Sequence, residues 1–232
     1  FIDKPISAIW DYKVTGIWQK DEVEEAKKYG QVPGDPKVWN NPANDQYDAD
    51  GNLVKVIYNN DDKVFQGNET PKVRWNMRNE FTIFKNWNVS FSMYSYLGHK
   101  KSLDYFTNNN ALLTVTNSIK RQYWTPDNPI NDYPRLRATS PGGISYSIYK
   151  NSSFLRLDNI TVGYTFPKEM LKRAKIEALS LNLTMKNVGY ITGFPVYDPE
   201  YQSKVPTGTP NETITGNPNI PRTIYFGINL TL

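Results

Sequence analysis

The sequence predicts an all-β protein that forms part of the wall of a transmembrane β-barrel. Three observations predict this fold class. Apolar residues alternate with polar ones over several runs, each run is about as long as a tilted membrane-crossing strand, and long connections alternate with short ones. Short turns at one end of a sheet and long loops at the other are the layout of an outer-membrane barrel.

Six strands are expected, because an alternation of period two is typical of a strand with two different faces. The first run is less regular than the others. A bulge is expected near Asp158 and Asn159, where the alternation changes phase. The expected strands lie near 6–18, 72–84, 87–97, 154–166, 179–190 and 222–232.

The two faces of these strands are expected to meet different surroundings. Apolar residues should face lipid and the alternating polar residues should face the lumen. The lipid-facing set is Val89, Phe91, Met93, Leu181, Leu183, Ile228 and Leu230, and the lumen-facing set is Asn88, Ser90, Asn182, Thr184 and Asn229.

The connections between the runs set the expected orientation. Residues 85–86 and 167–178 form short links, whereas 19–71, 98–153 and 191–221 form long ones. Short turns lie on the periplasmic side of such barrels and long loops lie outside. A large soluble sandwich is the alternative, but its links would be shorter and more even. Six strands are too few to close a barrel, for which about eight are needed, so the chain is expected to be part of a larger wall.

One helix is expected inside the first long loop, over residues 22–29. Asp21 would cap it, acidic residues fill its first turn, and Gly30 would end it.

Composition excludes several classes of function. The 232 residues include no Cys and one His, which excludes thiol nucleophiles, disulfides and zinc fingers. The net charge of +4 comes from scattered basic residues, unlike the stripe of a nucleic-acid binder. His99 is expected in an exposed loop, and no catalytic motif is present, so no enzymatic activity and no cofactor are expected.

A weak calcium candidate lies in the first long loop. Asp48, Asp50 and Asn52, with Gly51 for the turn, resemble half of a calcium-binding loop, but the distal Glu is missing. An ordinary Asx turn is the alternative.

Aromatic residues in the long loops are the best candidates for binding a ligand or a partner. Tyr123 and Trp124 stand beside Asp127 and Asn128, so flat apolar faces adjoin amide and carboxylate groups. Sugars stack on such faces and bond to such polar groups. The alternative is that these side chains anchor the loops on each other or on a partner. Arg135, Arg137 and Tyr197 complete the candidate set for a partner surface.

Several motifs resemble the SusC/RagA family of TonB-dependent outer-membrane transporters. They cover most of the chain and occur in the family's order. The motifs are the stretch Ser153–Pro167 (SFLRLDNITVGYTFP), Leu181–Asn187 (LNLTMKN), Tyr197–Glu200 (YDPE), Pro221–Leu232 (PRTIYFGINLTL) and, upstream, Gly30–Asp35 (GQVPGD) with Asp48–Asn52 (DADGN).

The resemblance implies a place for the chain in a larger import machine. It implies a barrel of about 22 strands, with a plug and N-terminal barrel strands belonging to a longer chain. It further implies a SusD-like surface lipoprotein as partner, energy from TonB, and glycans or peptides as substrate, in the outer membrane of a Gram-negative, Bacteroidetes-type cell. A surface adhesin or glycan-binding β-protein without transport is the alternative function.

Overall fold

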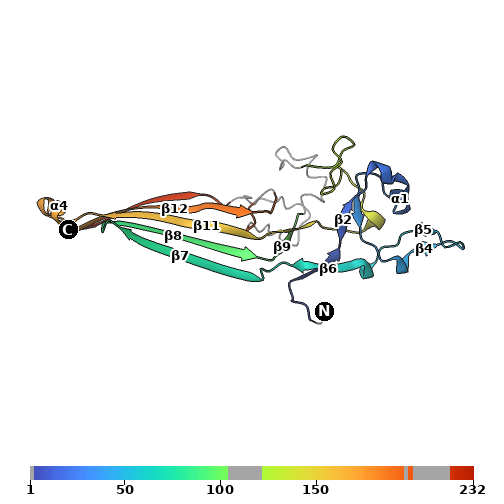
Figure 1. Cartoon of the computed structure of the whole chain (residues 1–232), viewed down its shortest axis with the longest axis horizontal. Coiled ribbons are helices and arrows are strands. Elements are labelled where there is room, and N and C mark those ends of the chain that lie inside the picture. The colour runs from blue at the N-terminus through green and yellow to red at the C-terminus, as the bar shows by residue number, and fades with distance from the viewer. Residues whose placement is uncertain (1–2, 104–121, 196–197, 201–219) are drawn as a thin grey trace, which may run out of the picture. The chain divides into compact units, whose positions relative to one another are not determined.

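The computed structural model describes residues 3–103, 122–195, 198–200 and 220–232. The chain divides into two compact units (Figure 1). Unit 1 contains the described parts of Phe1–Thr70 and Lys100–Asn151, and unit 2 contains those of Pro71–His99 and Ser152–Leu232. Among the described residues, no helix is both long and apolar enough to cross a membrane.

Unit 2 is a five-stranded antiparallel sheet with the strand order β13-β12-β11-β8-β7. The strands are β7 (Val73–Ile83), β8 (Trp87–Leu97), β11 (Phe154–Thr165), β12 (Ala178–Thr192) and β13 (Thr223–Thr231). Phe84 and Lys85 adopt positive φ in the tight turn between β7 and β8. Helix α4 (Lys168–Leu171) and the 3-10 turn η5 (Lys172–Ala174) connect β11 to β12.

These five strands lie where the alternation of the sequence placed them, with ends that differ by at most two residues. The expected bulge is also present. The register of β11 shifts between Leu157 and Asn159 against both of its neighbours, β8 and β12. The extra residue, Asp158, keeps the later part of β11 in phase with the rest of the sheet.

The prediction of one strand near 6–18 is wrong. The segment forms two short strands instead of one, and neither joins the five-stranded sheet. β1 (Ala8–Tyr12) pairs with β6 (Lys63–Asn68), and β2 (Val14–Ile17) pairs with β3 (Pro36–Val38). Backbone pairing with these nearby segments satisfies its hydrogen bonds inside unit 1.

The register of the sheet places the two expected sets on opposite faces. Every residue of the expected lipid-facing set lies on one face, and every residue of the expected lumen-facing set lies on the other. One apolar row crosses all five strands through Phe81, Val89, Val162, Leu183 and Phe226. The adjacent polar row is Glu80, Ser90, Thr161, Thr184 and Tyr225.

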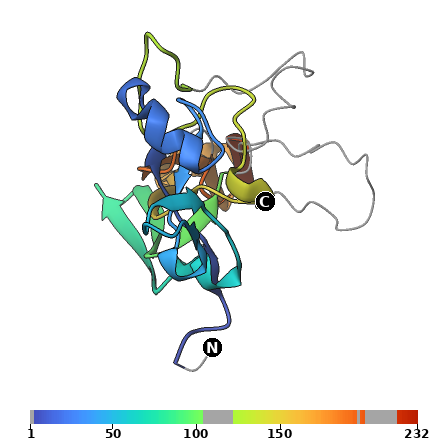
Figure 2. The same cartoon turned by 90° about the vertical axis from the view of Figure 1, so that its right-hand side faces the viewer.

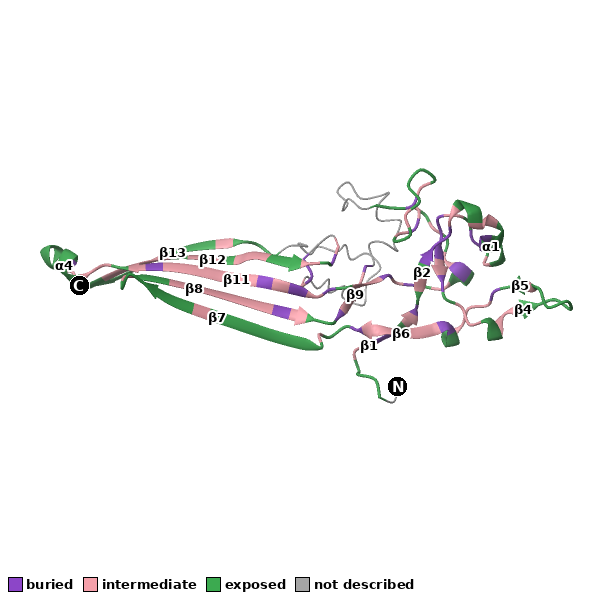
Figure 3. Cartoon of the chain, in the orientation of Figure 1, coloured by how far each residue is buried: buried purple, intermediate pink, exposed green. Residues whose placement is uncertain are grey.

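The apolar face carries large side chains that remain exposed. On β13, Ile224 and Phe226 are each 65% exposed and Ile228 is 60% exposed. Both edge strands, β7 and β13, are exposed along almost their whole length (Figure 3). The buried residues of β8 and β11 are Ser95, Phe154 and Arg156 at one end of the sheet and Gly163 near the other. A soluble sandwich would bury this face against a second sheet.

His99, two residues after the end of β8, corrects a second expectation. It is 4% exposed, not an exposed loop residue. Its Nε2 lies 2.8 Å from Ser152 Oγ, and the Ser152 amide donates to its carbonyl oxygen. The contact forms because the end of β8 meets the chain that enters β11.

Unit 1 is built from short elements around a small core. Its sheets are the two-stranded pairs β1–β6, β2–β3, β4–β5 and β9–β10. The helix α1 and the β1–β6 pair lie at different ends of the unit in both views (Figures 1 and 2). The elements not yet given are η1 (Lys20–Glu22), α1 (Val23–Lys28), η2 (Pro42–Asn44), β4 (Gln46–Tyr47), β5 (Leu53–Lys55), η3 (Asn60–Asp62), β9 (Lys100–Ser102), η4 (Pro141–Gly143) and β10 (Tyr149–Asn151).

The expected helix is present with a different start. Gln19, not Asp21, begins the helical turns: its side chain pairs with the Glu22 amide while the Glu22 carboxylate accepts from the Gln19 amide at 2.8 Å. The helix α1 ends before Gly30, whose φ of 68° is the left-handed conformation expected after a helix. A capping box therefore replaces the single cap that the sequence suggested.

Candidate functional site

Trp124, a predicted ligand residue, lies in the core of unit 1. We call residues 122–139, which carry six of the seven predicted site residues, the strap. Trp124 is 5% exposed, and its Nε1 donates to Gln19 Oε1 at 3.0 Å. Its ring packs on Gly34, where an added Cβ would lie 2.5 Å from the ring carbon Cε3. Trp124 thus anchors the strap and offers no open face for stacking.

Arg135 anchors the strap a second time. Its Nε pairs with Asp35 Oδ1 at 2.9 Å, and Asp35 is fully buried. The Thr139 and Val32 amides donate to the same carboxylate at 2.8 and 3.0 Å. All three contacts compensate for the burial of a charge. The motif around Gly30–Asp35 therefore has a structural role, which is to receive the strap.

The remaining strap candidates are exposed. Tyr123, Asp127, Asn128 and Arg137 all face solvent. Asn128 closes a tight turn: its amide donates to the Thr125 carbonyl at 3.0 Å, and its Nδ2 donates to the Tyr123 carbonyl at 3.3 Å. The structure therefore separates the candidates into two anchors and four surface residues. Tyr197 lies outside the described residues.

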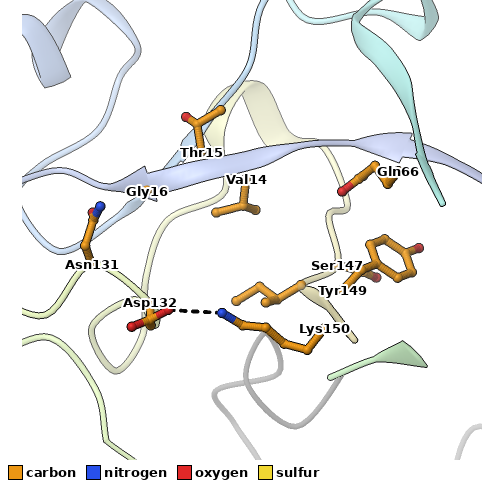
Figure 4. Close-up of a pocket in the computed structure, with 10 residues that line it drawn as sticks. Val14, Thr15, Gly16, Gln66, Asn131, Asp132, Ser147, Tyr149 and Lys150 are labelled. Atoms are coloured by element: carbon orange, nitrogen blue, oxygen red, sulfur yellow. Dashed lines mark hydrogen bonds and ion pairs between the residues drawn. The ribbon is translucent and has the colours of Figure 1, made fainter. Parts of the chain in front are cut away.

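Two hollows in unit 1 adjoin the strap. The first, of about 380 Å³, lies between β2, β6, β10 and the strap residues Asn131 and Asp132 (Figure 4). Lys150 and Asp132 pair at 3.0 Å across its edge. The second, of about 620 Å³, is lined by Gln19–Glu22, Lys37 and the strap residues Pro126, Pro129 and Asn131. Sequence reasoning missed both, because their walls come from segments more than a hundred residues apart.

The calcium candidate forms an Asx turn between β4 and β5. Asp48 Oδ1 accepts from the amides of Asp50 and Asn52 at 3.0 and 2.8 Å, and its Oδ2 accepts from Asn52 Nδ2 at 3.1 Å. These bonds, that from the Asn52 amide first, lower the pKa of the Asp48 carboxyl. Within the described part of the chain, no group of three or more His, Cys, Asp or Glu is placed to hold a metal ion.

A buried cluster on the polar face of unit 2 escaped the sequence reasoning. Arg156, from the Ser153–Pro167 stretch, pairs with Asp198 and Glu200 of the Tyr197–Glu200 motif. Arg156 and Asp198 are each 1% exposed. The signal that could have revealed the cluster was the single basic residue of that stretch, Arg156, together with the two acids of the second motif.

No protein-family model matches the chain. Individual known proteins do match it in sequence. The chain is similar to TonB-dependent receptor P26 of Formosa agariphila (25% identical over 229 residues, 94% of this chain) and to receptor P3 of the same organism (24% over 234 residues, 97% of this chain). The chain spans 22% of the length of each.

Solved structures match the chain in fold. The RagAB peptide importer in its open-open state gives a TM-score of 0.58 at 17% identity, covering 100% of this chain and 24% of that one. Its closed-closed state gives 0.57 at 20% identity, covering 96% and 23%. Both comparisons confirm the resemblance stated from the motifs, and these relatives are named as receptors and importers, not as enzymes.

Proposed function

We propose that this chain is the C-terminal part of the barrel of an outer-membrane importer. The chain is similar in sequence to TonB-dependent receptors and in fold to RagAB. One observation carries the proposal: a five-stranded antiparallel sheet has a largely apolar face, most of whose side chains are exposed or half-buried, and an opposite face that is largely polar. Lipid in contact with the apolar face and a water-filled lumen at the polar face would account for the character of the two faces.

Unit 1 then belongs to the extracellular side. Its segments occupy the two long connections, before β7 and between β8 and β11, whereas the short turn at 84–86 and the α4 connection lie at the other ends of the strands. Because long loops of such barrels are extracellular, unit 1 lies where substrate and surface partners arrive.

A SusD-like lipoprotein is the partner that we propose for unit 1. The four exposed strap residues supply an aromatic ring, an acid, an amide and a guanidinium, which are the mixed chemistry of an interface rim around an anchor. The two strap anchors hold these residues on the unit. TonB would supply energy through an N-terminal part of the complete protein, and the substrate would be an oligosaccharide or a peptide.

The complete gene with its neighbours tests the proposed function. The coding region should extend upstream by a plug and further barrel strands, and a lipoprotein gene should accompany it. Cells that lack the gene, or TonB, should lose uptake of either a labelled oligosaccharide pool or a labelled peptide pool. A short gene with no plug, or unchanged uptake of both pools, would favour the adhesin.

The strap tests the partner separately. Replacing Tyr123 with Ala should weaken recovery of the lipoprotein with the transporter while the amount of barrel in the membrane stays unchanged. Trp124→Ala is the comparison, because it should destabilise unit 1 by roughly 3–5 kcal/mol through loss of a buried ring. If Tyr123→Ala, Asp127→Ala and Arg137→Ala each recover as much lipoprotein as the wild type does, the strap is not part of the interface.

A further inference from the structure

The buried guanidinium of Arg156 contacts the first described end of the connection from β12 to β13 directly and the second through Asn187, an arrangement that the proposed function does not explain. Arg156 lies on β11, opposite Tyr94 of β8 and Tyr190 of β12, on the polar face. Its Nη2 contacts Asp198 Oδ1 at 2.5 Å, and its Nε forms an ion pair with Glu200 Oε2. These two acids lie in the connection from β12 to β13, which starts after Thr192.

Further bonds fasten this first end. The Tyr94 hydroxyl donates to Glu200 Oε2 at 2.6 Å, and the Glu200 amide donates to Asp198 Oδ1 at 3.0 Å. The guanidinium also lies over the Tyr190 ring, 5.0 Å from its centroid. Planar Arg suits this place because its five donors can serve several acceptors at once while its face stacks on an aromatic ring.

The second end of the connection is held through Asn187. Arg156 Nη1 donates to Asn187 Oδ1, and Asn187 Nδ2 donates to the carbonyl oxygen of Ile220. Asn187 has a φ of 50°, a conformation that Asn tolerates better than most residues. Its amide therefore links the guanidinium to the residue that precedes β13.

We propose that Arg156 is a positioning residue that fastens the two described ends of the connection from β12 to β13 to the polar face of the sheet. The first end is Asp198 with Glu200, and the second is Ile220, which is held through Asn187. One cation faces two carboxylates, of which Asp198 is buried and the Glu200 side chain is 19% exposed. Removing the cation leaves a buried and a part-buried negative charge without a compensating cation. Both carboxylates would then move to solvent, and Asn187 would lose the bond that orients it toward Ile220. The consequence of this anchoring for import rests on the proposed function.

Hydrogen exchange of the complete membrane protein, followed by mass spectrometry, tests the anchoring. In Arg156→Gln, exchange of peptides that cover 194–200 and of those that cover 220–224 should rise together, by about tenfold or more, as expected for lost bonds to a charged group. Asp198→Asn should raise exchange at the first end only. Asn187→Gly, which keeps the positive φ, should raise it at the second end only.

Arg78→Gln is the matched control. Arg78 stands on β7 on the same face and pairs with Glu80, but both side chains are exposed, by 70% and 64%. Its loss should leave both peptides unchanged. If Arg156→Gln frees only one end, or raises exchange equally along β11 and β12, the proposal is wrong. If Arg156→Gln fails to reach the membrane, the double variant Asp198→Asn/Asn187→Gly replaces it, and protection of both ends in that protein would overturn the proposal.

Uptake separates this inference from the proposed function. A folded Arg156→Gln protein should import less than the wild type, and Arg156→Lys should restore only part of the loss, because an ammonium lacks the guanidinium fork. A wild-type protein that imports nothing would overturn the proposed function, whereas the exchange result would still decide the anchoring. Full uptake by a protein with two freed ends would show that the anchor does not serve import.

Discussion

At the scale of single residues, one close approach organises unit 1. Gly34 has a φ of 91° and lies against Trp124 and Arg135, the two anchors of the strap. Only glycine combines that conformation with so little volume. The Asp35 carboxylate follows directly, so the sequence Gly34-Asp35 supplies both the space and the charge that hold the strap.

Gly34→Ala should therefore destabilise unit 1 by about 1–3 kcal/mol, through backbone strain and a clash of its new Cβ with Trp124. Gly30→Ala is the control: its φ is also positive, but an added Cβ would meet nothing within 4 Å. Local stability can be read from hydrogen exchange of the Asp35 and Trp124 amides. Equal losses in the two variants would mean that crowding by the strap has no part in the effect.

The Asp48 turn carries a pH dependence whose sign follows from its lowered pKa. The charged carboxylate stabilises the turn fully above the ordinary Asp pKa of about 4. This contribution is lost as the pH falls through the lowered pKa of Asp48. Hydrogen exchange of a peptide that covers 48–52 should be faster in Asp48→Asn than in the wild type. The rate in the variant divided by the rate in the wild type should be largest near neutral pH and should fall in acid. A ratio that does not change with pH would contradict this assignment.

At the scale of elements, the two faces of β13 should respond oppositely to charge. Ile228→Arg should destabilise the folded barrel by roughly 2–4 kcal/mol if the residue lies near the membrane midplane, since lipid cannot solvate the charge. Asn229→Arg, one residue later on the polar face, should cost much less. Unfolding in lipid vesicles with denaturant measures both. Equal costs would show that the apolar face of β13 does not meet lipid.

At the scale of the whole molecule, the sheet of unit 2 has two unpaired edges. β7 and β13 each pair on one side only within the described chain. Their open edges present unpaired amide and carbonyl groups that recruit other strands. In the complete protein that we propose, neighbouring strands would cover both edges.

The 232 residues expressed alone should therefore aggregate or need the missing strands for folding, whereas the complete protein should extract from membranes as a single species in detergent. Size-exclusion chromatography of the two proteins under the same detergent conditions compares them. A monodisperse, soluble monomer of the 232 residues that unfolds cooperatively would count against the barrel assignment.

The sequence by itself determined the five long strands, their faces and the bulge. The reason is that alternation is a local property: each Cβ points to the opposite side from its neighbour, so the pattern of β8 from Trp87 to Leu97 already assigns its faces. The helix α1 was likewise local, since its acidic first turn and the following Gly30 can be read from nine consecutive residues.

Only the tertiary structure decided which segments meet. Residues 8–17 alternate loosely enough to suit several partners, and pairing with β6 and β3 placed them in unit 1. Trp124 became an anchor because Gly34 and Gln19, far away in the chain, form its pocket. Arg156 became a buried hub because Asp198 and Asn187 reach it from other segments. Burial and charge pairing depend on contacts between distant residues, and a local pattern carries no record of them.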